Sequence, residues 1–293
     1  MKGAKAGSSW TGYAFVGPFL LFYLLVVVWP LMLGIGISLH RADLFGARLW
    51  IGLENYALIL ADPVFWQSVR NTLLLALLIV PPLTALALLL ALALNRATRG
   101  AAIFRGVFFS SSVLSVTIVT LIWRFILVPD AGLVAEATTA LGGEPLPFLS
   151  DPSLVIPSLA ITTIWWSLGF PIMLFLAGLQ QVPHDIYEAA ALDRASRWTT
   201  FWRITLPSIR RTLLLVIMLQ TAAQLQIFGQ AQLLTGGGPS GASRTMVLYI
   251  FEVAFGRWEL GYAVAMAELL FLMILAVTLL QYWLTTRRED DAR

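Results

Sequence analysis

The sequence contains no cysteine and only two histidines, His40 and His184, which lie far apart along the chain. The absence of cysteine excludes disulfides, thiol catalysis and cysteine metal sites, and two distant histidines do not indicate a histidine-rich metal centre. Lysine occurs only as Lys2 and Lys5. A Walker A loop needs a lysine after its glycines to hold phosphate, so this chain does not bind ATP in that way.

Charge is also scarce. Of the 293 residues, 12% are charged and 59% are hydrophobic, and the mean hydropathy is +0.82. A soluble domain is about half apolar and about a quarter charged, so the composition excludes a disordered chain, a disulfide-stapled secreted scaffold and an ordinary cytosolic enzyme. The net charge of +3 gives no reason to expect a nucleic-acid partner, because in a membrane protein the distribution of basic residues between the two sides carries the information.

Long apolar segments predict an all-α integral membrane protein with six transmembrane helices. The segments lie at 13–39, 69–94, 103–128, 154–180, 212–235 and 260–285. The first follows two lysines, as a signal peptide would, but it is too long for the apolar part of one and no small-residue cleavage site follows it. We therefore interpret it as an uncleaved first span.

Basic residues predict the orientation of these spans. With the N-terminus in the cytoplasm, 13 of the 19 basic residues fall on or near the inner side: Lys2 and Lys5, Arg105, the arginines of 95–102 and 181–211, and those near the C-terminus. The outer side keeps only Arg41, Arg48, Arg70, Arg124, Arg244 and Arg257, together with most of the acidic residues. The positive-inside rule thus predicts that both termini are cytoplasmic.

The inner loop 181–211 has the pattern of two short helices. Pro183 suits the first turn of a helix, and Asp185 and Glu188 complement its dipole. Alanines follow, which favour helix, and Ser196 is suited to cap a second helix. From periodicity alone, the loop is equally consistent with an amphipathic helix pair that lies on the inner leaflet.

Several motifs occur together in this chain. The inner loop carries Glu188-Ala189-Ala190 and, further on, Ile204-Thr205-Leu206-Pro207. The others are Ile51-Gly-Leu-Glu-Asn-Tyr56, Phe65-Trp66 with Asn71-Thr72, Leu121-Ile-Trp-Arg124 and Leu234-Thr-Gly-Gly-Gly-Pro239. In this order they resemble the inner-membrane permease subunits of binding-protein-dependent ABC importers, specifically the maltose-type sugar branch. The likeness covers roughly residues 10–286.

The resemblance implies a type I ABC importer permease fold in the bacterial cytoplasmic (inner) membrane. It divides the chain into a disordered cytoplasmic N-terminus (1–9), the first transmembrane helix and an outer loop (10–65), the transmembrane domain with the 181–211 coupling loop (66–286) and a cytoplasmic tail (287–293). The coupling loop would dock in a cleft of a separate ATPase subunit, through Glu188, Ala189, Ala190, Leu192, Asp193 and Arg194. No cofactor is expected on this chain, because ATP and Mg would belong to the ATPase subunits. For Glu188 alone, the alternative is a solvated charge that complements the helix dipole.

Arg194 departs from the family pattern, which usually has glycine at this position. A glycine can adopt a left-handed turn between the two helices, whereas another residue pays roughly 1–2 kcal/mol for it. Either Arg194 accepts this strain or the turn differs in this chain. Arg194→Gly is predicted to be tolerated for transport.

Polar residues within the spans are candidates for the substrate pathway. Gln220 and Gln224 share a helix face, as do Gln226 and Gln230. Lipid-facing glutamine is unfavourable, so this span should be surrounded by protein or water. The resemblance implies that it lines the central pathway, which makes Gln220, Gln224 and Phe228 candidates; interhelical hydrogen bonding is the alternative.

Three further residues are candidates for the same pathway. Glu268 lies inside the sixth apolar segment, where a charge is costly and usually faces protein or a cavity. It either lines the pathway or packs against a neighbouring span or the partner subunit. Trp165 and Asn71 are less specific candidates, since tryptophans within spans commonly serve in packing.

The function implied by the resemblance is an ATP-driven importer subunit for a disaccharide or short oligosaccharide delivered by an external solute-binding protein. Its partners would be a second homologous permease subunit, two ATP-binding cassette subunits and membrane lipid. A glycerol-3-phosphate or polyol importer of the same branch is an alternative. An ion-coupled secondary transporter using Glu268 is another, although no inverted repeat is evident. No histidine, cysteine or paired-carboxylate constellation supports a membrane-embedded enzyme.

Overall fold

The computed structural model describes residues 9–43, 45–129 and 131–290, and the chain divides into two compact units. Unit 1 comprises the chain up to residue 62 together with 250–271, and unit 2 comprises 63–249 together with the chain from residue 272 onward. Of the predicted disordered segment 1–9, residues 1–8 lie outside the described residues, and Ser9 already belongs to the first helix. The last helix continues to Asp290, so the predicted tail 287–293 is described only in part.

Unit 1 begins with the first apolar segment. Its elements are α1 (Ser9–Tyr23), η1 (Leu24–Val28, a wider π-type turn), α2 (Trp29–Ser38), the antiparallel strands β1 (His40–Ala42) and β2 (Arg48–Trp50), α3 (Glu54–Ala61), η4 (Glu252–Gly256) and the start of α15 (Leu260–Asp290). The helical stretch Ala14–Ser38 is long and apolar enough to cross a membrane, as predicted for 13–39. The two short strands and α3 lie in what the sequence indicated only as an outer loop.

The end of α2 is tied to α3 by side-chain hydrogen bonds. The Asn55 amide nitrogen donates to the backbone carbonyl oxygens of Ser38 at 2.7 Å and His40 at 3.0 Å, and the hydroxyls of Ser38 and Tyr56 are 2.8 Å apart. Gly261 of α15 lies so close to the His40 carbonyl that a Cβ atom there would overlap it. These contacts hold the hairpin, α3 and the start of α15 together.

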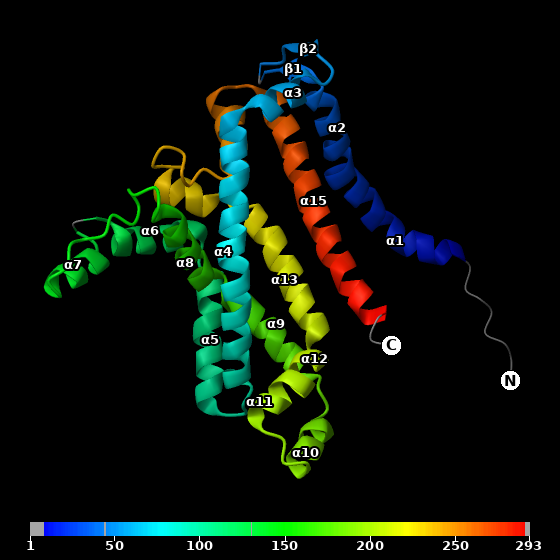
Figure 1. Cartoon of the computed structure of the whole chain (residues 1–293). Coiled ribbons are helices and arrows are strands. Elements are labelled where there is room, and N and C mark those ends of the chain that lie inside the picture. The colour runs from blue at the N-terminus through cyan, green and yellow to red at the C-terminus, as the bar shows by residue number, and fades with distance from the viewer. Residues whose placement is uncertain (1–8, 44, 130, 291–293) are drawn as a thin grey trace. The chain divides into compact units, whose positions relative to one another are not determined.

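Unit 2 is a helical bundle around α4 (Figure 1). Its elements are α4 (Pro63–Leu94), α5 (Arg99–Val113), α6 (Val116–Leu127), α7 (Leu133–Ala140), α8 (Val155–Ser167), α9 (Gly169–Gln180), α10 (His184–Leu192), α11 (Arg197–Thr200), η2 (Phe201–Thr205), α12 (Leu206–Ser208), α13 (Arg210–Leu225) and η3 (Ala231–Thr235); α14 (Met246–Phe251) begins in it. Helix α4 packs against α8, α9 and α13. Its buried side chains recur every four residues, which places them on one face of the helix: Leu75, Ile79, Leu83, Ala87 and Ala91.

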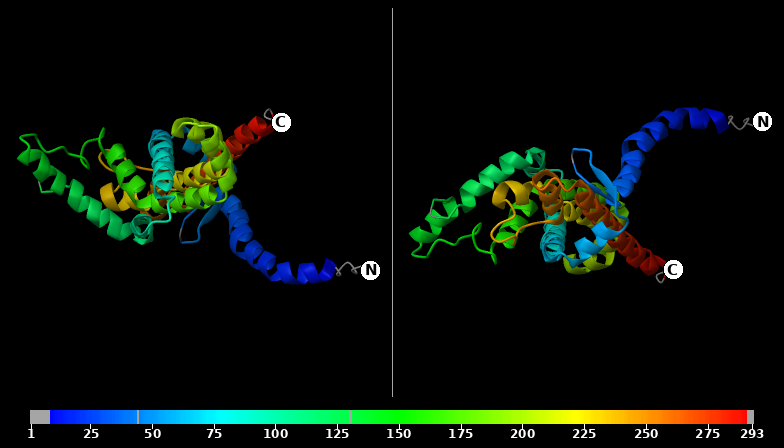
Figure 2. Two further views of the ribbon diagram at one scale, coloured as in Figure 1. Left: turned by 90° about the horizontal axis from the view of Figure 1, so that it is seen from below. Right: turned by 90° about the horizontal axis from the view of Figure 1, so that it is seen from above.

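Two of the predicted spans are bent pairs of helices. The segment 103–128, predicted as one helix, breaks after Val113, and α5 and α6 meet at 100°. Ser115 explains the restart, because its hydroxyl accepts a hydrogen bond from the Ile118 amide and caps α6. In both views of Figure 2, α6 and α7 extend away from the rest of unit 2. The segment 154–180 is the pair α8 and α9, bent by 49°.

Span counting therefore depends on how bent helices are treated. Within the described residues, Ala14–Ser38, Pro63–Leu94 and Leu260–Leu284 are each long and apolar enough to cross a membrane. The pairs α5–α6, α8–α9 and the segment 197–208 with α13 pass the same test together. This gives three spans, or up to six if each bent pair counts as one.

The predicted fifth span, 212–235, is too long. Helix α13 ends at Leu225, and the chain turns before η3. A residue of a later segment stabilises this break, because the Thr245 hydroxyl donates a hydrogen bond to the Ile227 carbonyl at 2.8 Å. The prediction that Gln226 and Gln230 share one helix face is therefore wrong. The short helix α14 in the following segment was not predicted, since six residues give too short an apolar period to recognise.

Candidate functional site

The loop 181–211 folds as a helix pair at one end of unit 2, beyond the ends of α9 and α13 (Figure 1). Pro183 precedes α10 in an extended conformation, one position earlier than the first turn in which the sequence predicted it. Asp185 lies in the first turn of α10, where its charge complements the helix dipole. The predicted pair of short helices is confirmed.

Arg194 adopts the left-handed conformation that the family's glycine would supply, with φ of 53°. Two hydrogen bonds close the end of α10 around it. The Ala195 amide donates to the Ala190 carbonyl at 2.9 Å, and the Arg194 amide donates to the Ala191 carbonyl at 3.0 Å. This is the Schellman pattern of helix termination. Of the two possibilities, Arg194 accepts the strain and the turn is retained.

The second helix of the pair is capped and linked back to the first. The Ser196 hydroxyl accepts a hydrogen bond from the Thr199 amide at 3.1 Å, so Ser196 is the N-cap that the sequence predicted. The Tyr187 hydroxyl donates to the Thr205 hydroxyl oxygen at 3.3 Å, which joins α10 to η2. A helix pair with fixed caps and a cross-link can move as one body.

The six candidate coupling residues differ in exposure. Ala190 is 7% exposed and packs into its own chain, whereas Leu192 is 85% exposed. The remaining four are exposed: Glu188, Ala189, Asp193 and Arg194. The Glu188 carboxylate lies 3.0 Å from the His184 ring, but both side chains are exposed, so this pair adds at most about 0.5 kcal/mol. The helix pair 184–208 therefore presents the apolar side chain of Leu192 and charges of both signs on its surface.

The polar face of α13 is partly as predicted. Gln220 and Gln224 are buried, and the Gln224 amide nitrogen lies 3.4 Å from the Gln220 amide oxygen. Phe228 is half-buried and lies beyond the end of α13, in the turn before η3. The structure thus brings the two glutamines together and leaves Phe228 on a separate segment of the backbone.

The other pathway candidates have contacts within the chain. The Asn71 amide nitrogen donates to the carbonyl oxygens of Gly241 at 2.9 Å and Arg244 at 3.0 Å, which fastens the loop after η3 to α4. Trp165 is exposed, and its ring packs edge-on against Trp123, with ring centroids 5.9 Å apart. Glycine-rich residues 236–239 form a tight turn, with positive φ at Gly236.

Glu268 is half-buried in α15. Its Oε1 atom lies against Gly34 of α2, where an added Cβ would come within 2.9 Å. Among the alternatives left open by the sequence, this position corresponds to packing against a neighbouring span. Its role in the pathway stays a prediction.

Sequence reasoning missed two contacts of these residues. Thr205 stood out only as part of the motif Ile204–Pro207, and Tyr187 was not considered, although together they join the helix pair. The partners of Asn71 are more than 160 residues away in the sequence and could not be recognised from local pattern.

Apart from one short hairpin, the described elements are helices. Several of them are able to cross a membrane, and a capped, exposed helix pair lies at one end of unit 2, as expected for a membrane permease. Residues 84–290 match the family described as "Binding-protein-dependent transport system inner membrane component", and the chain belongs to this family of multi-pass membrane proteins. The resemblance drawn from the motifs is confirmed.

Relatives and a solved structure agree with this assignment. The chain is 31% identical over 280 residues to the trehalose/maltose transport system permease protein MalF of Thermococcus litoralis, covering 95% of both chains. It is 35% identical over 246 residues to the multiple sugar-binding transport system permease protein MsmF of Streptococcus mutans, covering 82% of each. A chain of a bacterial alginate ABC transporter, crystallised with an alginate pentasaccharide-bound periplasmic protein, has the same fold with a TM-score of 0.84, 23% identity and 95% coverage of both chains.

Proposed function

We propose that this chain is the permease subunit of an ATP-driven importer that carries a disaccharide or short oligosaccharide delivered by an external solute-binding protein. The supporting observation is the exposed, capped helix pair 184–208 in a chain of the binding-protein-dependent family. The relatives named for trehalose/maltose and multiple-sugar transport support sugar as the solute class.

The proposed assembly places the work of ATP hydrolysis on other chains. A second homologous permease subunit would complete the pathway, and two ATP-binding cassette subunits would hold ATP and Mg. This chain would cross the bacterial cytoplasmic membrane six times with both termini in the cytoplasm. It would have no enzymatic activity of its own.

Coupling would pass through the helix pair. Closure of the ATPase subunits would push on Glu188, Ala189 and Leu192, while Ala190 supports the pair from beneath and Asp193 and Arg194 form the turn. The Tyr187–Thr205 link would carry the displacement into η2 and the start of α13. Alternating exposure of the pathway to the two sides would follow.

The pathway is proposed to involve Gln220, Gln224 and Phe228, with Glu268, Asn71 and Trp165 as further candidates. Amides suit sugar hydroxyls because each provides both donors and an acceptor. The long Gln220–Gln224 contact of 3.4 Å leaves hydrogen-bonding capacity that a sugar can use. Glycerol-3-phosphate or a polyol is the alternative solute.

The half-buried carboxylate of Glu268 is the one observation that favours an ion-coupled transporter instead.

A reconstituted assay separates the ATP-driven importer from the ion-coupled transporter. The chain is assembled in proteoliposomes with its partner permease, the ATPase subunits and a binding protein loaded in turn with maltose, trehalose, lactose or glycerol-3-phosphate. We expect one sugar to stimulate ATP hydrolysis and to accumulate only when ATP is present. Accumulation driven by a proton or sodium gradient without ATP would refute the proposal.

The absence of cysteine makes orientation directly measurable. Leu192→Cys and Leu49→Cys each introduce a single, exposed thiol into the otherwise cysteine-free chain. In intact cells, a membrane-impermeant maleimide should label Leu49→Cys and leave Leu192→Cys unlabelled until the membrane is opened. The reverse pattern would place the helix pair outside and exclude a role in contacting a cytoplasmic ATPase.

A further inference from the structure

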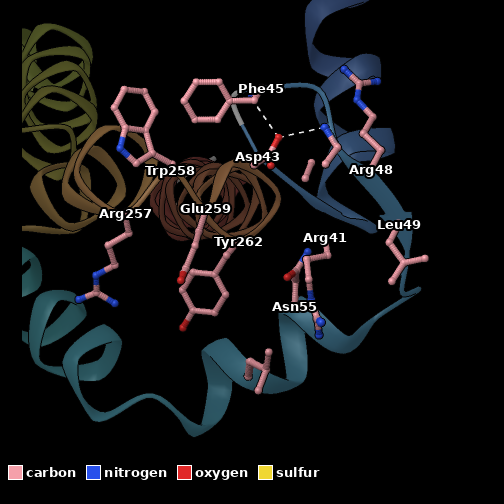
Figure 3. A pocket seen from close by; sticks show the side chains of 13 residues that line it. Arg41, Asp43, Phe45, Arg48, Leu49, Asn55, Arg257, Trp258, Glu259 and Tyr262 are labelled. Carbon is pink, nitrogen blue, oxygen red and sulfur yellow. Dashed lines mark hydrogen bonds between the residues drawn. The ribbon is translucent and has the colours of Figure 1, made fainter.

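Unit 1 contains a cavity of about 710 Å³ between the β1–β2 hairpin, α3 and the start of α15 (Figure 3). This volume is within the range of roughly 300–1,000 Å³ typical of small-molecule sites. All lining residues belong to unit 1. None of them is among the pathway candidates. Apart from Tyr262, at the start of the sixth apolar segment, they lie in segments that the sequence assigns to the outer side.

Two aromatic rings form one wall of this cavity, which we call the hairpin pocket. Phe45 and Trp258 lie with ring centroids 5.7 Å apart and planes inclined by 38°, and both are exposed, at 82% and 47%. The two rings are therefore accessible and not packed into a core. Figure 3 shows them side by side at the edge of the pocket.

Trp258 is held in an uncommon backbone conformation, with φ of 62°. A bulky residue in the left-handed region is an outlier that persists only where the surrounding structure enforces it, and such outliers cluster at ligand sites. Here the Glu259 amide donates to the Val253 carbonyl and the Leu260 amide donates to the Trp258 carbonyl. This turn keeps the indole at the pocket edge.

Polar groups of both signs line the remainder of the hairpin pocket. Arg48, Arg257 and Glu259 are exposed. Asp43 has a structural task, because its Oδ1 atom accepts from the Phe45 and Ala47 amides, both at 2.9 Å. That turn fixes the position of Phe45. The pocket thus combines a preformed aromatic wall with guanidinium donors and a carboxylate acceptor.

We propose that the hairpin pocket binds a carbohydrate, with one sugar ring stacked on Trp258 and Phe45 and its hydroxyls bonded to Glu259, Arg48 and Arg257. The aromatic wall suits the apolar face of a sugar ring, and hydroxyls can both donate and accept hydrogen bonds. The charged lining disfavours a lipid chain. A phosphate, which the three arginines of the lining would also attract, is tested with glycerol-3-phosphate. The choice of sugar probes rests on the proposed function.

The test uses the complete permease–ATPase complex in nanodiscs without binding protein. Binding of radiolabelled maltose, trehalose and lactose is measured by equilibrium dialysis, with glycerol-3-phosphate for contrast. We expect one sugar to bind, and Phe45→Ala and Trp258→Ala each to weaken its affinity at least about tenfold. Trp258→Tyr, which keeps an aromatic face, should restore most of it, and this guards against a folding defect in Trp258→Ala.

Trp50→Ala is the matched control. Trp50 is an exposed aromatic residue of the same hairpin, but its ring packs edge-on against His40 and it does not line the pocket. It should leave sugar affinity unchanged. Equal losses in Trp50→Ala and Trp258→Ala would overturn the proposal. Loss of binding in Gln224→Leu alone would also overturn it, by assigning the bound sugar to the pathway.

Two arms distinguish the source of the sugar. If binding is measured without binding protein, the hairpin pocket takes free solute. If it occurs only when loaded binding protein is added, and still depends on Trp258, the pocket takes solute presented by that protein. No Trp258-dependent binding in either arm, at sugar concentrations up to about 10 mM, overturns the proposal. Uptake by the same complex is measured separately. Uptake without sugar binding at the hairpin pocket would refute the proposed pocket site but not the proposed function. Sugar binding at the pocket without uptake would refute the proposed function but not the pocket site.

Discussion

Small residues serve opposite purposes in the bundle of unit 2 and in its exposed helix pair. In the bundle, Gly178 of α9 faces Thr212 of α13 so closely that an added Cβ would lie 2.5 Å from the threonine hydroxyl oxygen. Gly169 likewise approaches the backbone of α5 at Phe108. In the helix pair, Ala189 is exposed and no segment among the described residues covers it. A small side chain in the bundle marks a contact already made, whereas one in the helix pair leaves room for a contact with another chain.

The largest expected effect is a loss of stability from a substitution at the close contact between α9 and α13. Gly178→Leu forces α9 and α13 apart, because the added side chain meets Thr212 at three atoms within 3.0 Å. Overpacking of this kind costs about 3 kcal/mol. We expect a large loss of thermal stability in detergent, measured by size-exclusion melting. Gly106→Leu, at a helical glycine with no atom within 4 Å, is the control; equal losses in both variants would show that the α9–α13 contact is not special.

The next effect concerns the link between α4 and the loop after η3. Asn71→Ala removes the two hydrogen bonds that its amide nitrogen donates to the Gly241 and Arg244 carbonyl oxygens, at an expected cost of about 2 kcal/mol. Gln67→Ala is the comparison, since this half-buried side chain reaches the same loop only at 3.4 Å. The same melting measurement should rank Asn71→Ala well below Gln67→Ala. Wild-type stability in Asn71→Ala with a selective loss of uptake would instead support the pathway role of Asn71.

The helix pair should respond in transport and not in stability. Leu192→Asp places a charge on the most exposed apolar side chain of α10. Uptake should fall roughly tenfold, equivalent to about 1.4 kcal/mol at the subunit contact, with unchanged melting of the isolated chain. Leu141→Asp changes another leucine of unit 2 that is exposed to the same degree, and it should transport normally. Normal uptake by Leu192→Asp would remove Leu192 from the coupling surface.

The smallest expected effect is a gain in stability. Arg194→Gly relieves a left-handed non-glycine residue, and after the entropy cost of glycine the unfolding free energy should rise by about 1 kcal/mol. Uptake should be unchanged. Arg194→Val provides the opposite variant, since a β-branched residue fits this conformation poorly and should lower the melting temperature. If Arg194→Gly abolishes uptake, the guanidinium group itself contacts a partner.

The helices of this chain were predictable where an apolar run is long and uninterrupted. The segment 13–39 emerged as one helical stretch and 69–94 as part of α4. The prediction was wrong where polar side chains end a helix inside an apolar run. Ser115 caps α6 within the segment 103–128, and Thr245, twenty residues beyond Leu225, holds the turn that ends α13. Hydropathy does not register either event, because one hydroxyl hardly changes the average over a span.

Local hydrogen bonding explains why the two helices of the pair and the cap at Ser196 could be predicted from the sequence. The cap at Ser196 and the turn at Arg194 join residues at most five positions apart, so their geometry follows from neighbouring residue types. The sequence determined the contacts of the pathway candidates less fully. Gln220 and Gln224 share a face because helical period requires it, whereas the contacts of Asn71 and Glu268 join segments distant in sequence.

Composition, periodicity and motif order alone established a multi-pass permease with an exposed helix pair, because these properties depend on residue type and near-neighbour spacing. Only the tertiary structure decided which small residues are covered, which amides are already occupied, and that Phe45 and Trp258 meet at one pocket more than 200 residues apart in the chain. The reason is that burial is a property of the three-dimensional neighbourhood: a side chain's partners are fixed when distant segments pack, and no local pattern encodes them.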